Sequence, residues 1–543
     1  MNDLQFLKTK TIGWYVVLAV ALAIYIPNLS VRPVNIMEAR NFITAREMLT
    51  DNHWLLTTMN GFPRYQKPPL PTWLTAVSGA LFGIDSVWAL RLPAALITIM
   101  GLFFVYRFTL RLSDGNVVLS VSSSLVVATS FYVIFAGRNG QWDIYTHAFM
   151  LGALYYLFQW LQSDHHTWRN AIGCGIGIGC SFMSKGPVSM FALMLPFLIA
   201  YGCTYGKGTG VVLKKQAGSL VILFSIAIGL SAWWPSYVSY YDSQTLEAIA
   251  NKETTSWVVR NVRPFYYYWS FFIQSGIWTL LALPAITYPY MKTRVSLPKE
   301  YRFAILWTLC SVLLLSLVPE KKSRYLLPVL FPLGIVIAFY LEYMFKTFSI
   351  KGKRIEKIPL YIHFGILSAI GILFPLSYYL KPILFQEQPY LWSLFSIFLL
   401  LSAGSMLYAL IKKRIQLAFI SSIGFILFCV CFGIPLAKPL FFTEIYEDLT
   451  PMVAYSKKYE LPIYALYTPT PEIVWKYGKK IPVFDVHYRD EDRIILLVQK
   501  DIGEETIQRE IRFKDIQQVG HIDLNSPGNR DRLRYKWFIC SLK

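Results

Sequence analysis

Long blocks of apolar residues recur along most of the chain, separated by short polar segments. Each block is about 17 to 25 residues long, and a helix of that length crosses about 30 Å of hydrocarbon. The blocks begin near residues 12, 88, 116, 144, 169, 187, 213, 265, 302, 325, 358, 389 and 415. The pattern therefore predicts a mainly α, polytopic membrane protein with about 13 transmembrane helices.

Basic residues gather in alternate loops between these blocks. If the N-terminus is cytoplasmic, the inside loops 206–215, 291–302, 346–357 and 412–414 are rich in Lys and Arg, as the positive-inside rule requires. Three longer segments then lie outside: 30–87, 236–264 and the tail from 438. An odd number of spans is what places the tail on the outer side.

The outer segments differ in character. Residues 37–51 and 70–83 look helical but only partly apolar, which predicts interfacial helices within the outer loop 30–87. After residue 441 charges rise, and β-rich runs at 463–467, 493–498 and 535–541 alternate with a helical stretch at 446–459. We expect a membrane domain over 1–437 and a small periplasmic C-terminal α/β domain over 438–543.

Composition agrees with a membrane protein. Hydrophobic residues make up 55% of the 543 residues and charged residues only 15%, so membrane lipids are the expected surroundings. The net charge of +20 could indicate nucleic acid, but the basic residues sit in short loops, and we expect no nucleic-acid partner. The seven cysteines show no metal-ligand or disulfide spacing. Glycines at 173, 175, 177 and 179 predict close helix packing rather than chemistry.

Charged residues on the predicted outer side are the candidates for chemistry. Many lie at span ends or in short turns, where holding an ionised group near the membrane is costly and usually serves a function. The alternative is a solvated loop charge or a side chain that reaches the lipid headgroups. The set comprises Glu38, Arg40, Arg46, Arg64, Lys67, Arg138, Asp143, Lys185, Arg260, Arg263, Lys321, Lys322 and Arg324. Several cations beside a carboxylate suit a phosphate leaving group together with a base.

The chain resembles the superfamily of bacterial aminoarabinose transferases and protein O-mannosyltransferases. That superfamily usually begins with Asp-Glu-x-Arg, followed by Glu-Lys-Pro-Pro-Leu. The matching stretches here are 37–40 (Met-Glu-Ala-Arg), 65–70 (Tyr-Gln-Lys-Pro-Pro-Leu), 89–93, the turn at Asp143, 185–187 (Lys-Gly-Pro), 264–268 and 324–328 (Arg-Tyr-Leu-Leu-Pro). Any one of these motifs is weak, but their shared order, spacing and sidedness make a specific signal.

The resemblance implies a GT-C glycosyltransferase fold, and we expect no cofactor in this chain. Such enzymes move a sugar from a polyprenyl-phosphate donor to a lipid A-like glycolipid, a protein hydroxyl or an envelope glycan, with inversion at the anomeric carbon. It also implies a bacterial cytoplasmic membrane with the active site on the periplasmic side. The implied ligands of the carrier phosphate are Arg40, Lys67 and Lys185, and Tyr325 is implied to lie beside the phosphate. Arg324 and Lys322 are further candidates for phosphate binding by their sequence position near Tyr325.

Three departures from the family pattern bear on the chemistry. Met37 replaces the first acidic residue of the Asp-Glu pair, so that Glu38 or Asp143 is left to act as the base or to orient the acceptor. Gln66 and Asn261 stand where aminoarabinose transferases can hold a divalent metal. Neutral amides are poor zinc ligands, so we expect no metal at these positions.

Two other classes of function compete with a transferase. A lipid-linked-sugar flippase or transporter would tend to carry ionisable residues in the middle of its spans and to show two related halves. The spans here are nearly free of charge at their centres, and no such halves are visible. A scaffold would leave the outer charges unexplained.

Overall fold

The computed structural model describes residues 9–162, 165–206, 209–259, 261–349, 354–441, 446–485, 492–502, 515–525 and 530–541. Two compact units emerge from it, and they do not follow chain order. The helical unit comprises Met1–Leu29, Tyr65–Pro71 and Arg91–Gly433, and the mixed unit comprises Ser30–Arg64, Thr72–Leu90 and Ile434–Lys543.

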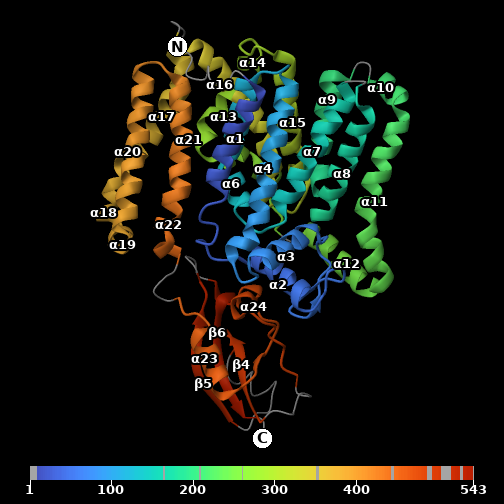
Figure 1. The fold of residues 1–543 in the computed structure, drawn as a ribbon, viewed down its shortest axis with the longest axis vertical. Coiled ribbons are helices and arrows are strands. Elements are labelled where there is room, and N and C mark those ends of the chain that lie inside the picture. The colour runs from blue at the N-terminus through green and yellow to red at the C-terminus, as the bar shows by residue number, and fades with distance from the viewer. Residues whose placement is uncertain are drawn as a thin grey trace. The chain divides into compact units, whose positions relative to one another are not determined.

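The helical unit contains most of the long apolar helices (Figure 1). In chain order its elements are α1 (Lys10–Tyr25), most of α4 (Val87–Leu112), α5 (Val117–Ala128), α6 (Phe131–Gly137), α7 (Asp143–Gln162), α8 (Thr167–Lys185), η1 (Met190–Met194), α9 (Leu195–Tyr205), α10 (Thr209–Lys215), α11 (Ala217–Tyr241), α12 (Ser243–Val259), η2 (Phe265–Tyr268), η3 (Phe271–Trp278), α13 (Thr279–Ile286), α14 (Tyr288–Met291), α15 (Pro298–Leu317), η4 (Ser323–Val329), α16 (Leu330–Thr347), α17 (Arg354–Leu373), η5 (Phe374–Leu376), α18 (Ser377–Leu380), α19 (Pro382–Glu387), α20 (Pro389–Ile411), α21 (Ile415–Phe428) and η6 (Cys429–Gly433).

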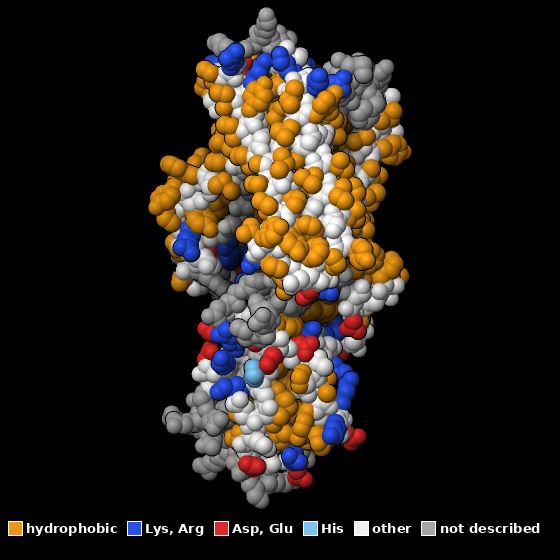
Figure 2. Space-filling view, turned by 90° about the vertical axis from the view of Figure 1, so that its left-hand side faces the viewer, with side chains coloured by type: hydrophobic (Ala, Val, Ile, Leu, Met, Phe, Trp, Pro, Cys, Tyr) orange, Lys and Arg blue, Asp and Glu red, His pale blue; other side chains and the backbone are white. Residues whose placement is uncertain are grey.

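Eight helices within the described residues are long and apolar enough to cross a membrane, or nine if α5 and α6, bent by 67°, form one span. The multi-pass character expected from the sequence is therefore confirmed, while the count of thirteen stays a prediction. Figure 2 shows hydrophobic side chains over the visible face of the helical part, with Lys and Arg gathered at one end of it. This distribution is typical of a membrane-embedded bundle.

The span Ser323–Thr347, which joins η4 to α16, lies at the centre of the helical unit. In its most apolar stretch 94% of residues are buried, against 22–56% in the other candidate spans. It packs against α5, α13 and α15. A helix surrounded by other helices is held rigidly, so η4 is a firm support for functional side chains.

The helices α7 and α8 form a hairpin whose surfaces meet closely. Gly177 on α8 faces the backbone of α7, where an added Cβ would lie 2.8 Å from the Ala153 nitrogen. Gly175, on the same helix, faces α11, and an added Cβ there would lie 2.8 Å from the Leu223 carbonyl oxygen. The glycine spacing thus serves close packing of α8 on both neighbours, as expected.

The mixed unit joins an early segment to the C-terminal residues. It contains α2 (Ile36–Thr50), β1 (Thr58–Met59), β2 (Phe62–Pro63), α3 (Leu70–Phe82), α22 (Ile434–Leu436), η7 (Lys438–Phe441), α23 (Thr450–Tyr459), β3 (Ile463–Ala465), α24 (Pro471–Tyr477), β4 (Arg493–Gln499), β5 (Asp515–Asp523), η8 (Asp531–Leu533) and β6 (Arg534–Ser541). The helices expected at 37–51 and 70–83 are present as α2 and α3. Three expected strands are present as β3, β4 and β6.

Four strands form a mixed sheet in the order β3-β4-β6-β5. The pair β3 and β4 is parallel, and the other two pairs are antiparallel, with a bulge between Gln518 and Gly520 on β5. Isoleucine 43 of α2 belongs to the same hydrophobic core as Ile495 of β4 and Trp537 of β6. The helix α2 also packs on α24, where Arg46 donates to the Val474 carbonyl at 3.1 Å.

Candidate functional site

A cluster of charged side chains surrounds Tyr325 in the helical unit. Aspartate 143 is the first residue of α7, and Lys185 is the last residue of α8, so the antiparallel hairpin brings the two together. Gly186 follows with a φ of 70°, a left-handed conformation that ends α8 directly after Lys185. The two charges also lie at the helix ends that favour them, the carboxylate at an N-terminus and the ammonium at a C-terminus.

Asp143 and Lys185 form a buried ion pair. The Lys185 ammonium contacts Asp143 Oδ1, and only 7% of the Asp143 side chain and 8% of the Lys185 side chain are exposed. The ammonium also lies 5.5 Å from the centre of the Tyr325 ring, within the range of a cation–π contact. The structure therefore brings together three of the residues selected from the sequence.

The other half of the cluster comes from the turn before η4. The Tyr325 hydroxyl donates to Glu320 Oε2 at 3.0 Å, and the Lys322 ammonium pairs with Glu320 Oε1. The Lys322 backbone is held by Tyr268, whose hydroxyl donates to the Lys322 carbonyl at 3.1 Å. We call Asp143, Lys185, Glu320, Lys322, Arg324 and Tyr325 the Tyr325 cluster.

Arg324 completes the positive charge of the cluster. Its guanidinium interacts electrostatically with Asp143, and its buried Nε has no hydrogen-bond partner among the described residues. Lys185, Lys322 and Arg324 together outnumber the carboxylates of Asp143 and Glu320 by one. The Tyr325 cluster thus has an excess positive charge and an unsatisfied donor, which suits an anionic ligand.

Lys67 lies in the segment Tyr65–Pro71 of the helical unit, where it pairs with Glu253 of α12 at 3.6 Å. The same segment is tied to the end of α11, because the Tyr65 hydroxyl donates to Asp242 Oδ2 at 3.0 Å. A shared role for Lys67 and Lys185 stays a prediction.

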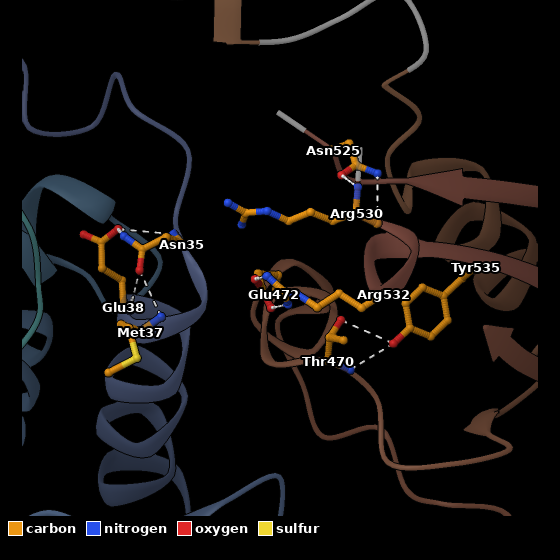
Figure 3. Close-up of polar contacts among 9 residues, drawn as sticks. All are labelled: Asn35, Met37, Glu38, Thr470, Glu472, Asn525, Arg530, Arg532 and Tyr535. Carbon is orange, nitrogen blue, oxygen red and sulfur yellow. Dashed lines mark hydrogen bonds and ion pairs between the residues drawn. The ribbon is translucent and has the colours of Figure 1, made fainter. Parts of the chain in front are cut away.

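Glu38 and Arg40 belong to α2 of the mixed unit. Glu38 is fully buried and closes a capping box, in which its Oε2 accepts from the Asn35 backbone at 3.2 Å and from the Asn35 amide at 2.8 Å (Figure 3). In return Asn35 Oδ1 accepts from the Met37 backbone at 2.9 Å. These bonds give Glu38 a structural task at the start of α2. The roles expected for Glu38 as base and Arg40 as phosphate ligand stay predictions.

The same close-up shows how the C-terminal part of the mixed unit uses its own charges. Arg532 binds Glu472 through two bonds of 3.0 and 2.7 Å, and the Tyr535 hydroxyl accepts from the Thr470 backbone at 3.0 Å (Figure 3). Glu472 is buried on α24, so this two-pronged pair joins η8 to α24. We interpret these contacts as structural.

Gln66 and Asn261, the two positions at which the resemblance implies a metal, offer a poor ligand set here. Asn261 has a φ of 54°, a left-handed conformation that Asn adopts readily, and its carbonyl accepts from the Lys321 backbone at 3.1 Å. Its side chain bonds Glu320. With Gln66 also an amide, these residues do not fit a divalent metal. Asn261 instead supports the turn that carries Glu320.

One group in the mixed unit has ligand atoms close enough for a metal. The carboxylates of Glu47 and Asp51 and the ring of His53 lie within 4.8 Å of one another. However, Glu47 already accepts from the Thr58 hydroxyl at 2.6 Å and from the Asn60 backbone at 2.6 Å. Lys480 pairs with Asp51 at 2.7 Å. We therefore interpret the group as the support of the β1–β2 turn.

Sequence reasoning missed Glu320, the residue that connects Lys322 to Tyr325. A sequence signal for Glu320 was present, because it is an acidic residue in a short turn, predicted to lie outside, that otherwise carries Lys321, Lys322 and Arg324. A lone carboxylate among cations is expected to pair with them. The turn geometry that selects Lys322 as its partner could not be read from the sequence.

Comparison with known proteins places this geometry in context. Residues 66–234 match the family model described as dolichyl-phosphate-mannose-protein mannosyltransferase. The chain is 24% identical to undecaprenyl phosphate-alpha-4-amino-4-deoxy-L-arabinose arabinosyl transferase 2 of Pseudomonas fluorescens, covering 62% of this chain and 57% of that protein. It is 25% identical to the corresponding transferase of Photorhabdus laumondii, covering 65% of this chain and 63% of that protein. The chain thus spans about three fifths of the length of these relatives.

The fold has a solved counterpart. The crystal structure of ArnT from Cupriavidus metallidurans bound to undecaprenyl phosphate matches with a TM-score of 0.70 at 17% identity, covering 97% of this chain and 98% of that one. Its apo state matches with a TM-score of 0.69. The fold is therefore that of ArnT, and the resemblance inferred from the motifs is confirmed.

Proposed function

We propose that the protein is a membrane glycosyltransferase that takes a sugar from a polyprenyl-phosphate carrier and binds the carrier phosphate at the Tyr325 cluster. The observation that carries this proposal is the convergence of Lys185, Lys322 and Arg324 on one tyrosine beside a buried carboxylate. Support also comes from the relatives described above, whose names are undecaprenyl phosphate-alpha-4-amino-4-deoxy-L-arabinose arabinosyl transferases.

The proposed reaction is an inverting displacement. An acceptor oxygen attacks the anomeric carbon of the sugar, the bond from that carbon to the phosphate oxygen breaks, and the carrier leaves as polyprenyl phosphate. The cations of the Tyr325 cluster stabilise the charge that develops on the leaving phosphate. A proton from an acceptor hydroxyl passes to a carboxylate, for which Asp143 is our first choice because it lies within the cluster.

The remaining expectations form part of the same proposal. The acceptor is a lipid A-like glycolipid, a protein hydroxyl or an envelope glycan. The protein resides in the bacterial cytoplasmic membrane with the Tyr325 cluster and the C-terminal residues on the periplasmic side. The positions of Asp143, Lys185 and Arg324 near helix ends support a surface reaction rather than transport through the bundle.

The test is acceptor-dependent release of undecaprenyl phosphate from undecaprenyl-phosphoryl sugars by the purified full chain. Several donor sugars are offered with membrane extracts as the acceptor source. We expect release from at least one donor, and a loss of about 100-fold or more in Lys185→Met, because a leaving-group cation is removed. The matched control is Lys346→Met, since Lys346 also pairs with a buried glutamate, Glu342, at 2.7 Å. Transport of intact donor without cleavage would contradict the proposal.

A further inference from the structure

Glu320 is a buried carboxylate that the proposed reaction does not use. Only 6% of the residue is exposed, and both of its oxygens face groups of the Tyr325 cluster. Oε2 accepts the Tyr325 hydroxyl proton at 3.0 Å, and Oε1 binds the Lys322 ammonium. Any anion that binds Lys322 or Tyr325 therefore has Glu320 as a neighbour.

The backbone around Glu320 is fixed from a second element. Glu320 pairs with Val262 in an isolated antiparallel bridge, and the Lys321 backbone donates to the Asn261 carbonyl at 3.1 Å. The groups that face the carboxylate are Lys322 and Tyr325 from its own segment, the Asn261 amide from the turn before η2, and Tyr268 from η2. Glu320 cannot move away from the cluster without breaking these contacts.

The carboxyl of Glu320 is ionised at neutral pH. Burial acts to raise its pKa, but the hydrogen bond and charge of Lys322 outweigh burial, together with hydrogen bonds from Tyr325 and Asn261. The pKa of Glu320 is therefore held below its usual range. The Glu320 carboxylate therefore places a negative charge among the cations of the Tyr325 cluster.

Such a charge distinguishes the two forms of the carrier. A sugar-bearing carrier phosphate is a diester with one negative charge, whereas the released carrier is a monoester that gains a second charge above a pKa of about 6. Repulsion from a fixed carboxylate grows with the charge of the ligand. The carboxylate penalises the released carrier more than the donor.

We propose that Glu320 is a positioning residue that selects the donor over the spent carrier. It holds Lys322 and Tyr325 in position to bind the donor, which is a phosphodiester. Its charge lowers the affinity of the site for the released carrier, which is a phosphomonoester, so that this product dissociates. This inference rests on the proposed function, because it requires a polyprenyl phosphate at the Tyr325 cluster.

The test compares two probes that differ by one ionisation. Undecaprenyl phosphate and undecaprenyl methyl phosphate are titrated into the purified full chain at about pH 8 and about pH 5, above and below the second phosphate pKa of about 6. Glu320→Gln should shift the ratio of affinities toward the monoester by about 3-fold to 30-fold at the higher pH. At the lower pH both probes carry one charge, and the shift should largely vanish.

Three variants make the result specific. Glu342→Gln neutralises another buried glutamate paired with a lysine, and it should leave the ratio unchanged. Glu320→Asp keeps the charge and should keep the wild-type ratio, and Glu320→Asn replaces Glu320→Gln if the latter fails to fold. The inference alone would be overturned if the wild type binds both probes and Glu320→Gln has the same ratio of affinities as the wild type at the higher pH. A wild type that binds neither probe would overturn the proposed function with it.

Discussion

The sequence left Glu38 and Asp143 as candidates for the base, and the contacts of the two carboxylates differ. Glu38 is engaged at the cap of α2, where Asn35 donates twice to its Oε2. Asp143 is paired with Lys185 inside a cluster of excess positive charge. A base must reach the acceptor at a site where the leaving group is also stabilised. At the residue scale this argues for Asp143.

Substitution by the isosteric amides tests this choice. Glutamine can also close a capping box, so Glu38→Gln should retain most of the transfer rate, whereas Glu38→Ala should lower stability by about 1 kcal/mol through loss of the cap. Asp143→Asn should lower the transfer rate by about 100-fold or more. The measurement is initial rate together with thermal unfolding of each variant. A Glu38→Gln protein that is folded but inactive would return the role to Glu38.

The hydroxyl of Tyr325 is the second residue-scale test. Tyr325→Phe removes the bond to Glu320 but keeps the ring beside Lys185. When the carrier binds, we expect this hydroxyl to donate to the phosphate instead of to Glu320. Because a hydrogen bond to a charged group contributes about 1.5 to 3 kcal/mol, carrier affinity should fall about 10-fold or more without the hydroxyl. Tyr408→Phe, at an exposed position on α20, is the control. Equal carrier affinity in both variants would remove Tyr325 from the site.

At the scale of elements, the apolar pattern located the helices well. The largest offsets are at 213, 302 and 358, where helices begin at Ala217, Pro298 and Arg354. Length and composition alone recover eight spans among the described residues. The helix α1 and the segment Met190–Tyr205 are too short for the test, α5 is bent away from α6, and α7 and α8 are not among the eight. The strand β5 escaped prediction, since its polar residues Gln517 and Gln518 lie on an exposed sheet edge and leave no alternating pattern.

Contacts between elements that are distant in the sequence are the other feature that the sequence did not predict. The packing of α2 on α24 joins residues such as Phe42 and Trp475, whose rings lie 5.2 Å apart. No local pattern encodes such a pair, because each residue is simply one apolar position of an amphipathic element. The hydrogen bond between Tyr325 and Glu320 could not be predicted for the same reason. Motifs indicated candidate residues, and only the folded chain showed which candidates meet.

The glycines of α8 provide a test at this scale. Gly177→Ala would place a Cβ 2.8 Å from the Ala153 nitrogen and should cost about 1 to 3 kcal/mol, because the backbone of α7 cannot yield. Gly202→Ala on α9 meets nothing within 4 Å and should be neutral or slightly stabilising. Thermal unfolding in detergent measures both. A Gly177→Ala variant as stable as wild type would refute the close approach of the two helices.

At the scale of the whole molecule, the orientation in the membrane is the main prediction from charge. The basic loops are expected inside and the Tyr325 cluster outside. In a background without the exposed Cys203, Tyr390→Cys should react with a membrane-impermeant maleimide in spheroplasts, and Lys412→Cys should react only after permeabilisation. Tyr390 is 91% exposed, so no described part of the chain covers it. The reverse pattern would place the cluster in the cytoplasm.

The most direct test of the whole account is a structure of the protein with undecaprenyl phosphate determined by electron cryo-microscopy. We expect density for the phosphate within hydrogen-bond distance of Lys185, Arg324 and the Tyr325 hydroxyl, at the end of the α7–α8 hairpin that carries Asp143. Phosphate density at the opposite end of that hairpin, beside Gln162 and Thr167, would contradict it.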